Sequence, residues 1–390
     1  MNIKQATRLD AIKEYYFSKK LKEIAQLKAA GKNIINLGIG NPDLPPSEMA
    51  RKELEKSCWE NTTHGYQSYR GIPELRKAMA DWYEKYYQVH VNSNHEILPL
   101  MGAKEGIMHL AMSFLEKGDE VLSPNPGYPA YRTASMLAGA KMIDYHLKAS
   151  NGWLPDLEKL EQQDLSKVKI MWINYPNMPT GAKAPLAFYN NLITFTKRNQ
   201  ILIINDNPYS FILNNPTSLL AIEGAKEVAM ELNSLSKSHN MAGWRVGMLL
   251  GKKEWIDIVL KFKSNMDSGM FLPVQRGAIA ALKNPPSWYT ELNKIYKKRQ
   301  SMVFEILGKL GCSFQKNQGG MFVWAKVSSN YPDGYALSDE VLKEHHIFIT
   351  PGGIFGSEGN EYVRISLCNT MDVLEKVLNQ LRIVKLRITN

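Results

Sequence analysis

Residues 234–247 read SLSKSHNMAGWRVG, and they place Lys237 between serine hydroxyls and a short distance before Arg245. A primary amine forms Schiff bases with carbonyl compounds, and a guanidinium beside hydroxyls suits a bound dianion. The alternative interpretation is a polar Ser-Lys-Ser loop that leads into a buried strand, VGMLLG (246–251). The stretch alone does not decide between these two interpretations, so the surrounding sequence has to.

Short apolar runs alternate with helical patterns through the middle of the chain. The strand candidates lie at 120–124, 141–147, 170–174, 201–206, within 228–235, and at 246–251. Runs such as ILII (201–204) show little polar alternation, which is typical of strands buried on both faces of a mostly parallel sheet. Helices are expected at 71–87, where Pro73 lies near the start, and at about 103–116. The sequence therefore predicts an α/β fold.

The pattern changes from about Pro286. Helices are expected over roughly 287–309, 337–345 and 372–384, with strands around CSFQKNQGGMFVWAKV, HIFITPGG and YVRISLC. These elements indicate a smaller α+β domain. We therefore predict a large domain over residues 41–285 and a small domain formed by 1–40 plus 286–390.

Composition excludes several classes of protein. The 390 residues contain no apolar run near the ~18 residues of a membrane span, and the start lacks a secretory signal. Three distant cysteines and eight dispersed histidines predict neither disulfides nor a metal site, so a cytoplasmic location is expected. The net charge of +10 comes from scattered lysines without a nucleic-acid-binding motif. It suits anionic small molecules, and we expect no nucleic-acid or membrane partner.

Asp206 and Tyr209 lie in the segment NDNPY (205–209), directly after the run ILII. In open α/β sheets, ligands bind beyond the carboxyl ends of the strands. A carboxylate there would keep a pyridine nitrogen protonated. The attraction between a carboxylate and a pyridinium ~4 Å apart is about 4 kcal/mol at an effective dielectric near 20. Together with Lys237, this favours pyridoxal 5'-phosphate (PLP) as a cofactor. The competing interpretation is that Asp206 caps a turn before Pro208.

Three other segments offer binding groups, and each has a structural alternative. The turn GAKEG (102–106) opens a helix whose free amides suit phosphate, as many strand-to-helix turns do. Tyr128 follows a predicted strand, where it either stacks on a flat ring or anchors a loop. Arg364 is flanked by apolar residues in YVRISL, so it either captures a carboxylate or forms a structural ion pair.

The order of these motifs along the chain resembles that in the class I and II aminotransferases of the PLP-dependent fold type I. The resemblance extends over nearly the whole chain. The opening signature of that family appears as INLGIGNPDLP (35–45). The resemblance implies a transferase with PLP joined to Lys237 as a Schiff base, its ring nitrogen on Asp206, and its phenolic oxygen on Tyr209.

The resemblance also implies residues for the rest of the cofactor and for the substrate. Those for the phosphate and the ring face are Ala103, Lys104, Ser234, Ser236, Arg245 and Tyr128. Arg364 and the backbone of Gly40 would bind the substrate carboxylate. Tyr66 would reach the phosphate in a neighbouring subunit, which implies a homodimer.

Met178 departs from the family pattern. It stands in NYPNMPTG (174–181), where the family has an asparagine that bonds the phenolic oxygen of the cofactor. A thioether donates no hydrogen bond. Either Asn177 takes over that role, or Tyr209 holds the oxygen alone and Met178 packs on the ring; we favour the second.

The resemblance implies a ping-pong transfer of an amino group between an L-amino acid and a 2-oxo acid, with glutamate as the common donor. Lys104 and the spacing of the segment YYFSKKLKEI are similar to the LL-diaminopimelate aminotransferase branch. In that branch an asparagine of the other subunit contacts the cofactor phosphate, and Ser268 stands at the matching position of this chain. The chain also resembles alanine, methionine and aromatic aminotransferases, and Tyr15 or Tyr16 would line the entrance.

Residues such as Met270 and Phe271 favour a medium or large apolar side chain in the substrate, although such residues are commonly part of a core. Two alternatives to an aminotransferase stay open at this point. One is a PLP-dependent C–S lyase of the same fold, and the other is a non-catalytic ligand-binding module.

Overall fold

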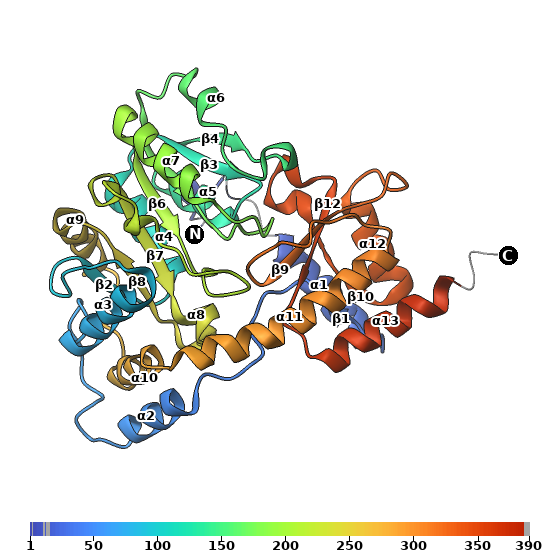
Figure 1. Cartoon of the computed structure of the whole chain (residues 1–390), viewed down its shortest axis with the longest axis horizontal. Helices are drawn as coiled ribbons and strands as arrows, with labels where there is room; N and C mark the ends of the chain where they lie inside the picture. The colour runs from blue at the N-terminus through green and yellow to red at the C-terminus, as the bar shows by residue number, and fades with distance from the viewer. Residues whose placement is uncertain (2, 11, 13–15, 386–390) are drawn as a thin grey trace.

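A seven-stranded sheet forms the centre of the computed structural model, which describes residues 1, 3–10, 12 and 16–385. The strand order is β2-β8-β7-β6-β5-β3-β4 (Figure 1). The strands are β2 (Ile97–Leu100), β3 (Glu120–Asn125), β4 (Lys141–His146), β5 (Val168–Ile173), β6 (Leu202–Asp206), β7 (Ala229–Ser234) and β8 (Gly247–Leu250). β8 runs antiparallel to both neighbours, and the other pairs are parallel. The predicted mostly parallel α/β sheet is confirmed.

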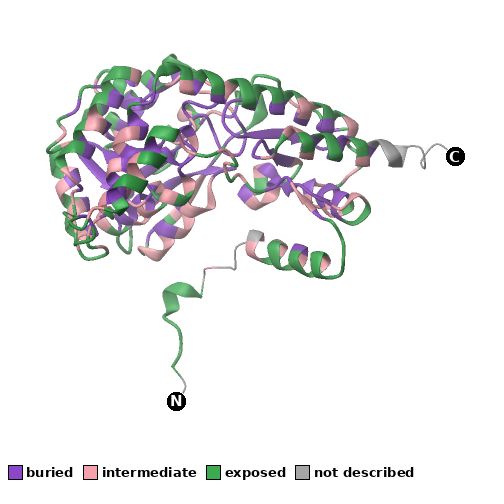
Figure 2. Cartoon of the chain, turned by 90° about the horizontal axis from the view of Figure 1, so that it is seen from below, coloured by how far each residue is buried: buried purple, intermediate pink, exposed green. Residues whose placement is uncertain are grey.

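Each face of this sheet packs on its own hydrophobic core, because successive side chains of a strand point to opposite faces. In β5, Ile170 and Trp172 face one core, and Met171 and Ile173 face the other. The first core includes residues of α4 (Ala103–Phe114), α5 (Pro129–Leu137) and α9 (Lys253–Lys263). The second includes residues of α3 (Pro73–Tyr87), α7 (Leu186–Asn199) and α10 (Leu272–Leu282). Figure 2 shows that the strands are buried between helices whose outer sides are exposed.

Two small sheets lie apart from the large one. β1 (Ile35–Asn36) pairs in parallel with β10 (Ile347–Phe348), so the start of the chain joins its last quarter. The other small sheet is antiparallel, in the order β11-β12-β9. Its strands are β9 (Phe322–Lys326), β11 (Thr350–Pro351) and β12 (Tyr362–Ser366). The division of the chain into domains at 40/41 and 285/286 stays a prediction.

Four helices surround these small sheets (Figure 1). They are α1 (Tyr16–Ala29), α11 (Pro286–Lys309), α12 (Gly334–His345) and α13 (Met371–Lys385). α11 extends from beside α10 to the small sheets, so it connects the two parts of the molecule. The described residues also form α2 (Glu48–Cys58), α6 (Leu157–Glu161) and α8 (Leu235–Ser238).

Most predicted elements are present, with ends shifted by a few residues. β2 was not predicted, since ILPL contains Pro99 and is short; it forms because β8 supplies an antiparallel partner. Part of the expected strand before Gly319 is absent, and Ser313 makes only an isolated bridge to Lys326. Within the described residues, no helix combines the length and apolar character that a membrane crossing requires.

Candidate active site

One cavity of about 430 Å³ lies beyond the carboxyl ends of the parallel strands. Asp206 is the last residue of β6, Ser234 is the last residue of β7, and Ala103 opens the helix after β2. Antiparallel β8 starts at this same edge, which brings Arg245 to it. The predicted site residues that line the cavity are Gly40, Ala103, Lys104, Tyr128, Asp206, Tyr209, Ser234, Ser236, Lys237, Arg245 and Arg364.

Lys237 sits in the short helix α8, directly after β7. Its Nζ donates a 2.8 Å hydrogen bond to the carbonyl oxygen of Gly40, a residue of the loop that follows β1. Burial lowers the pKa of Lys237, and the positive charges of Arg364 and Arg245 lower it further. The amine is therefore more easily deprotonated than an ordinary lysine.

Asp206 is buried, and its two carboxylate oxygens have different surroundings. Oδ2 accepts a 2.7 Å hydrogen bond from the hydroxyl of Tyr131, whose ring stacks on Trp172. Oδ1 is buried and accepts no hydrogen bond from any residue that the structure describes. Burial raises the pKa of Asp206 to about 6, although the Tyr131 bond opposes that rise. Such a carboxylate is suited to a cationic partner in the cavity.

Arg245 reaches the cavity from a left-handed backbone conformation, with φ 58°, and its Nη1 donates to the carbonyl oxygen of Ala242. Gly102, with φ 88°, lies against the guanidinium, and a Cβ at this position would be 2.1 Å from Nη2 of Arg245. Another residue at position 102 would be strained by the positive φ, and the guanidinium would have to shift to make room for its Cβ. The first amides of this helix and the hydroxyls of Ser234 and Ser236 line the same cavity.

Arg364 is buried in β12, between two aromatic rings. Its guanidinium lies 3.8 Å from the ring centre of Phe322 and 4.5 Å from that of Phe355. Nη2 donates to the carbonyl oxygen of Gly38, and Nη1 lies 3.2 Å from the sulfur of Met178. The stacked rings hold the guanidinium plane at the cavity wall, as a carboxylate-binding arginine needs.

The two asparagines of the turn after β5 have different hydrogen-bond partners. The amide of Asn174 donates to the carbonyl oxygen of Asp206 at 2.6 Å and its oxygen accepts from the backbone of Met178 at 2.7 Å. The oxygen of Asn177 instead accepts from the backbone and hydroxyl of Thr180, and its amide donates to the carbonyl oxygen of Asn174. Met178 and Asn174 line the cavity, and Asn177 is not among the residues that line it.

Other predicted residues also lie away from the cavity. Tyr66 is 92% exposed, and Ser268 is exposed too, so their predicted contacts to a second subunit stay predictions. Tyr15 lies outside the described residues. Tyr16 is half-buried and packs edge-on against Tyr335 of α12.

Several lining residues were not predicted. They are Leu21, Ile39, Ile107, Tyr131, Asn174, Pro208, Ala242, Phe322 and Phe355. Most are apolar residues in ordinary helical or strand patterns, so nothing in their local sequence distinguishes them from core. Asn174 is polar and stands in the quoted motif NYPNMPTG, so it could have been found from the sequence.

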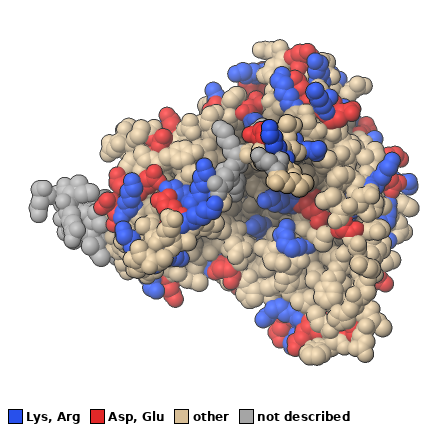
Figure 3. All heavy atoms as spheres, turned by 180° about the vertical axis from the view of Figure 1, so that it is seen from behind, with Lys and Arg blue, Asp and Glu red and all other residues tan. Residues whose placement is uncertain are grey.

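Positive charge gathers at the cavity. Its lining residues include Lys104, Lys237, Arg245 and Arg364, against a single acidic residue, Asp206. Figure 3 shows a hollow near the centre of one face, with lysine and arginine atoms in and around it. The positive electrostatic field of the cavity therefore favours ligands with phosphate or carboxylate groups.

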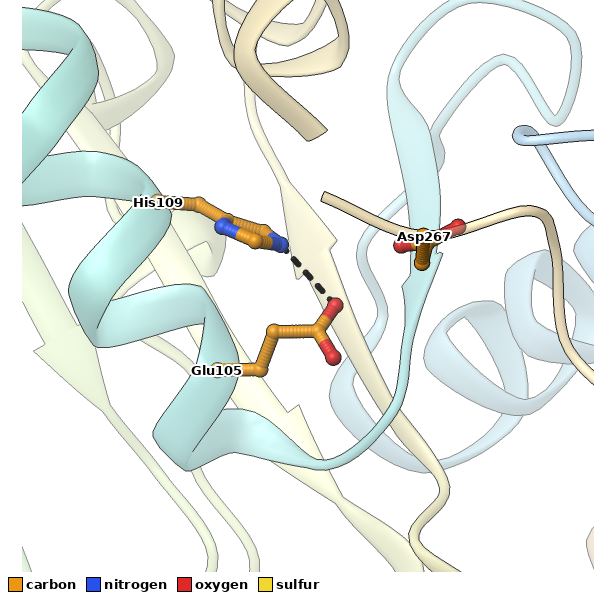
Figure 4. Close-up of side chains that lie close together, drawn as sticks. All are labelled: Glu105, His109 and Asp267. Atoms are coloured by element: carbon orange, nitrogen blue, oxygen red, sulfur yellow. Dashed lines mark hydrogen bonds and ion pairs between the residues drawn. The ribbon is translucent and has the colours of Figure 1, made fainter. Parts of the chain in front are cut away.

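A buried polar cluster lies next to the start of α4 (Figure 4). Nε2 of His109 lies 2.9 Å from Oε1 of Glu105, and a carboxylate oxygen of Asp267 completes a group within 4.8 Å. Lys263 neutralises Asp267 at 2.7 Å, and both side chains are only 4% exposed. Two contacts of these side chains are therefore present side by side, the Lys263–Asp267 ion pair and the Glu105–His109 hydrogen bond.

This chain is similar to known proteins over almost its whole length. A profile described as aminotransferase class I and II matches residues 32–381. The chain is 40% identical over 382 residues to an LL-diaminopimelate aminotransferase of Dehalococcoides mccartyi, covering 97% of this chain and 98% of that one. It is 37% identical over 385 residues to the enzyme of the same description from Aquifex aeolicus, covering 97% and 98%.

Two solved structures are similar over almost their whole length. Substrate-bound BacF from Bacillus subtilis shares 35% identity with a TM-score of 0.94 and 98% coverage of both chains. A Thermus thermophilus aspartate aminotransferase mutant shares the fold, with a TM-score of 0.91, 23% identity, and coverage of 98% of this chain and 100% of that one.

Proposed function

We propose that this chain, which belongs to the class I and II aminotransferase family and is an aminotransferase, binds PLP in the cavity and acts on L-amino acids with medium or large side chains. The observation that carries the proposal is the meeting of the Lys237 amine and the Asp206 carboxylate in one cavity with two arginines. These groups come from different segments, so their meeting is a property of the fold.

Members of this family use PLP, and the cavity residues fit the groups of that molecule. The unpartnered, buried Oδ1 of Asp206 is available to accept from a pyridinium N–H. Arg245, the two serine hydroxyls and the first amides of α4 offer donors for a phosphate. The hydroxyl of Tyr209 would serve the phenolic oxygen, since Met178 has no hydrogen to donate.

PLP supplies an aldehyde that bonds to amines and a protonated ring that withdraws electrons from the carbon beside the substrate nitrogen. Lys237 is the amine of the cavity suited to that bond. Because burial lowers its pKa, Nζ would also accept the proton from the substrate Cα and return it on the next step, a role typically worth 10²–10⁴-fold in rate. Gly40, whose carbonyl oxygen accepts from Nζ, would orient the amine.

Arg364 would hold the α-carboxylate of the substrate, since its guanidinium is fixed between Phe322 and Phe355 at the cavity wall. Apolar lining residues, among them Leu21 and Ile39, suit a medium or large side chain. Glutamate would be the common donor. The names of the relatives make LL-diaminopimelate an early candidate for testing.

Two copies of this chain would form a homodimer. Exposed Tyr66 lies in the loop before α3, and the ring of His64 in that loop packs against exposed Phe271 at 5.8 Å. Exposed aromatic side chains on these segments favour an interface with a second copy. In such a dimer we expect Tyr66 to reach the cavity of the other copy.

A half-reaction screen tests the proposal. Each amino acid is added to the PLP-loaded protein, and the absorbance is followed as the aldehyde form converts to the amine form of the cofactor. Conversion by glutamate and by at least one larger amino acid is expected, with one 2-oxo acid formed per site. Release of pyruvate and ammonia from a sulfur amino acid without a 2-oxo acceptor would indicate a C–S lyase, and binding without any conversion would indicate a non-catalytic module.

A further inference from the structure

Glu231 is a fully buried carboxylate in the middle of β7, outside the cavity. Its exposed fraction is 0%, and neutral groups donate to both of its oxygens. Oε1 accepts from the hydroxyl of Tyr83 at 2.9 Å and from the amide of Asn207 at 3.2 Å. Oε2 accepts from the amide of Asn205 at 2.8 Å and from the backbone N–H of Leu219 at 3.0 Å. A buried carboxylate without a cationic partner is uncommon and calls for a reason.

The partners of Glu231 flank the cavity carboxylate on both sides. Asn205 and Asn207 precede and follow Asp206, and alternate residues of an extended chain point the same way. With both amides bound to Glu231, the side chain of Asp206 points to the opposite side, where it lines the cavity. The backbone is held too, since the N–H of Asn207 donates to the carbonyl oxygen of Leu232 and Asn174 donates to that of Asp206.

The donors around Glu231 favour its ionised form. Asn205, Asn207 and Leu219 present N–H groups, and the hydroxyl of Tyr83 itself accepts from the amide of Asn233 at 3.0 Å, so its proton is free to point at Glu231. Burial raises the pKa of Glu231, but the bonds from Asn205 and Asn207 oppose that rise. A protonated carboxyl or a glutamine at position 231 would direct a hydrogen of its own toward a group that also donates.

We propose that Glu231 is a positioning residue, which holds the end of β6 so that Asp206 faces the cavity and whose charge adds to that of Asp206 in favouring a cation there. The inference rests on the proposed function, in which the cation is the protonated ring nitrogen of PLP. Burial, and after it the like charge of Glu231, act against the ionised form of Asp206 when no cation is present. A bound cation relieves both effects, so the affinity for PLP depends on two carboxylates.

The test compares Glu231→Gln with Asp206→Asn and with the surface control Glu227→Gln, whose side chain is 71% exposed and paired with Lys197. The dissociation constant of PLP is measured by titrating the cofactor-free protein, and kcat and KM are measured after saturation. We expect Glu231→Gln to weaken PLP binding about tenfold and to lower kcat by a similar factor. KM for the amino acid should stay within twofold, because Arg364 is untouched. The control should match the wild type.

Hydrogen–deuterium exchange of the cofactor-free variant separates positioning from a general loss of stability. Faster exchange is expected in residues 202–210 but not in the small sheets. If Glu231→Gln does not fold, Asn205→Ser removes one donor and should weaken PLP binding about threefold. Unchanged PLP affinity in these variants, alongside a clear loss in Asp206→Asn, would overturn the inference and leave the proposed function standing. No loss in Asp206→Asn would instead count against the proposed function itself.

Discussion

Nζ of Lys237 and the carbonyl oxygen of Gly40 are joined by a hydrogen bond of 2.8 Å, although the two residues lie 197 positions apart. A Cβ on Gly40 would be 2.2 Å from the ring of Phe322, and this ring also lies against Arg364. The loop after β1 is therefore packed between the lysine and the arginine, so one backbone segment links the proposed sites of proton transfer and carboxylate binding.

Lys237→Ala should abolish covalent attachment of PLP and lower kcat by at least about 10²–10⁴-fold, because the base is lost. Borohydride reduction followed by mass spectrometry measures the attachment. Lys183→Ala is the control, since this lysine pairs with Asn317 outside the cavity. Full turnover by Lys237→Ala would refute the assigned role.

Arg364→Ala should raise KM for amino acids by about 10- to 150-fold, which corresponds to the ~1.5–3 kcal/mol of a charge-assisted hydrogen bond. Turnover at saturation should fall less than kcat/KM. Arg198→Ala, which breaks an exposed pair with Glu161, should leave both parameters unchanged. An unaltered KM in Arg364→Ala would exclude carboxylate binding by this residue.

Asp206→Asn should stabilise the cofactor-free protein at neutral pH. The pKa of Asp206 is raised from 3.8 to about 6, so the folded state holds its proton more tightly than the unfolded state does. Stability is therefore lost as pH rises from about 4 to about 6, and a cost of roughly 3 kcal/mol persists above that range. Urea unfolding from pH 3.5 to 8 measures the difference between the two proteins, which should vanish near pH 4. A difference independent of pH would contradict the shifted pKa.

Met178→Asn should lower the pH at which the absorbance of bound PLP changes by about one unit. An amide at this position can donate to the phenolic oxygen, and one pKa unit corresponds to about 1.4 kcal/mol. Met178→Leu keeps the volume without a donor and should leave that pH unchanged. Equal shifts in both variants would mean that packing, and not the donated bond, sets the titration.

Lys263→Met should destabilise the protein by about 3–5 kcal/mol, because it leaves Asp267 charged and buried near Glu105 (Figure 4). Lys253→Met on the same helix is a matched control, since Lys253 pairs with Asp257 where the side chains are 55% and 39% exposed. That pair should contribute only ~0–1 kcal/mol. Denaturant unfolding measures the free energy of unfolding of both variants. Similar losses of stability in the two would show that burial of the Lys263 pair is unimportant.

The amino-acid sequence by itself determined the α/β class, most strands and helices, and the positions of Lys237, Asp206 and Arg245. Apolar runs, glycines and prolines act locally, so they identify strands and the turns that follow them. Because parallel strands end at one edge of a sheet, polar residues directly after such strands meet without further information. That is why Asp206 could be expected at this edge from its place after a strand, whereas the stretch around Lys237 did not decide its own role.

Only the tertiary structure decided which side chains surround these groups. It assigned Asn174 to the cavity and Asn177 to a turn, stacked Phe322 and Phe355 on Arg364, and placed Glu231 between the neighbours of Asp206. These contacts join segments far apart in the chain and depend on how helices and sheets pack. An apolar or acidic residue looks the same in its local sequence wherever packing later places it, so its partners follow from the fold alone.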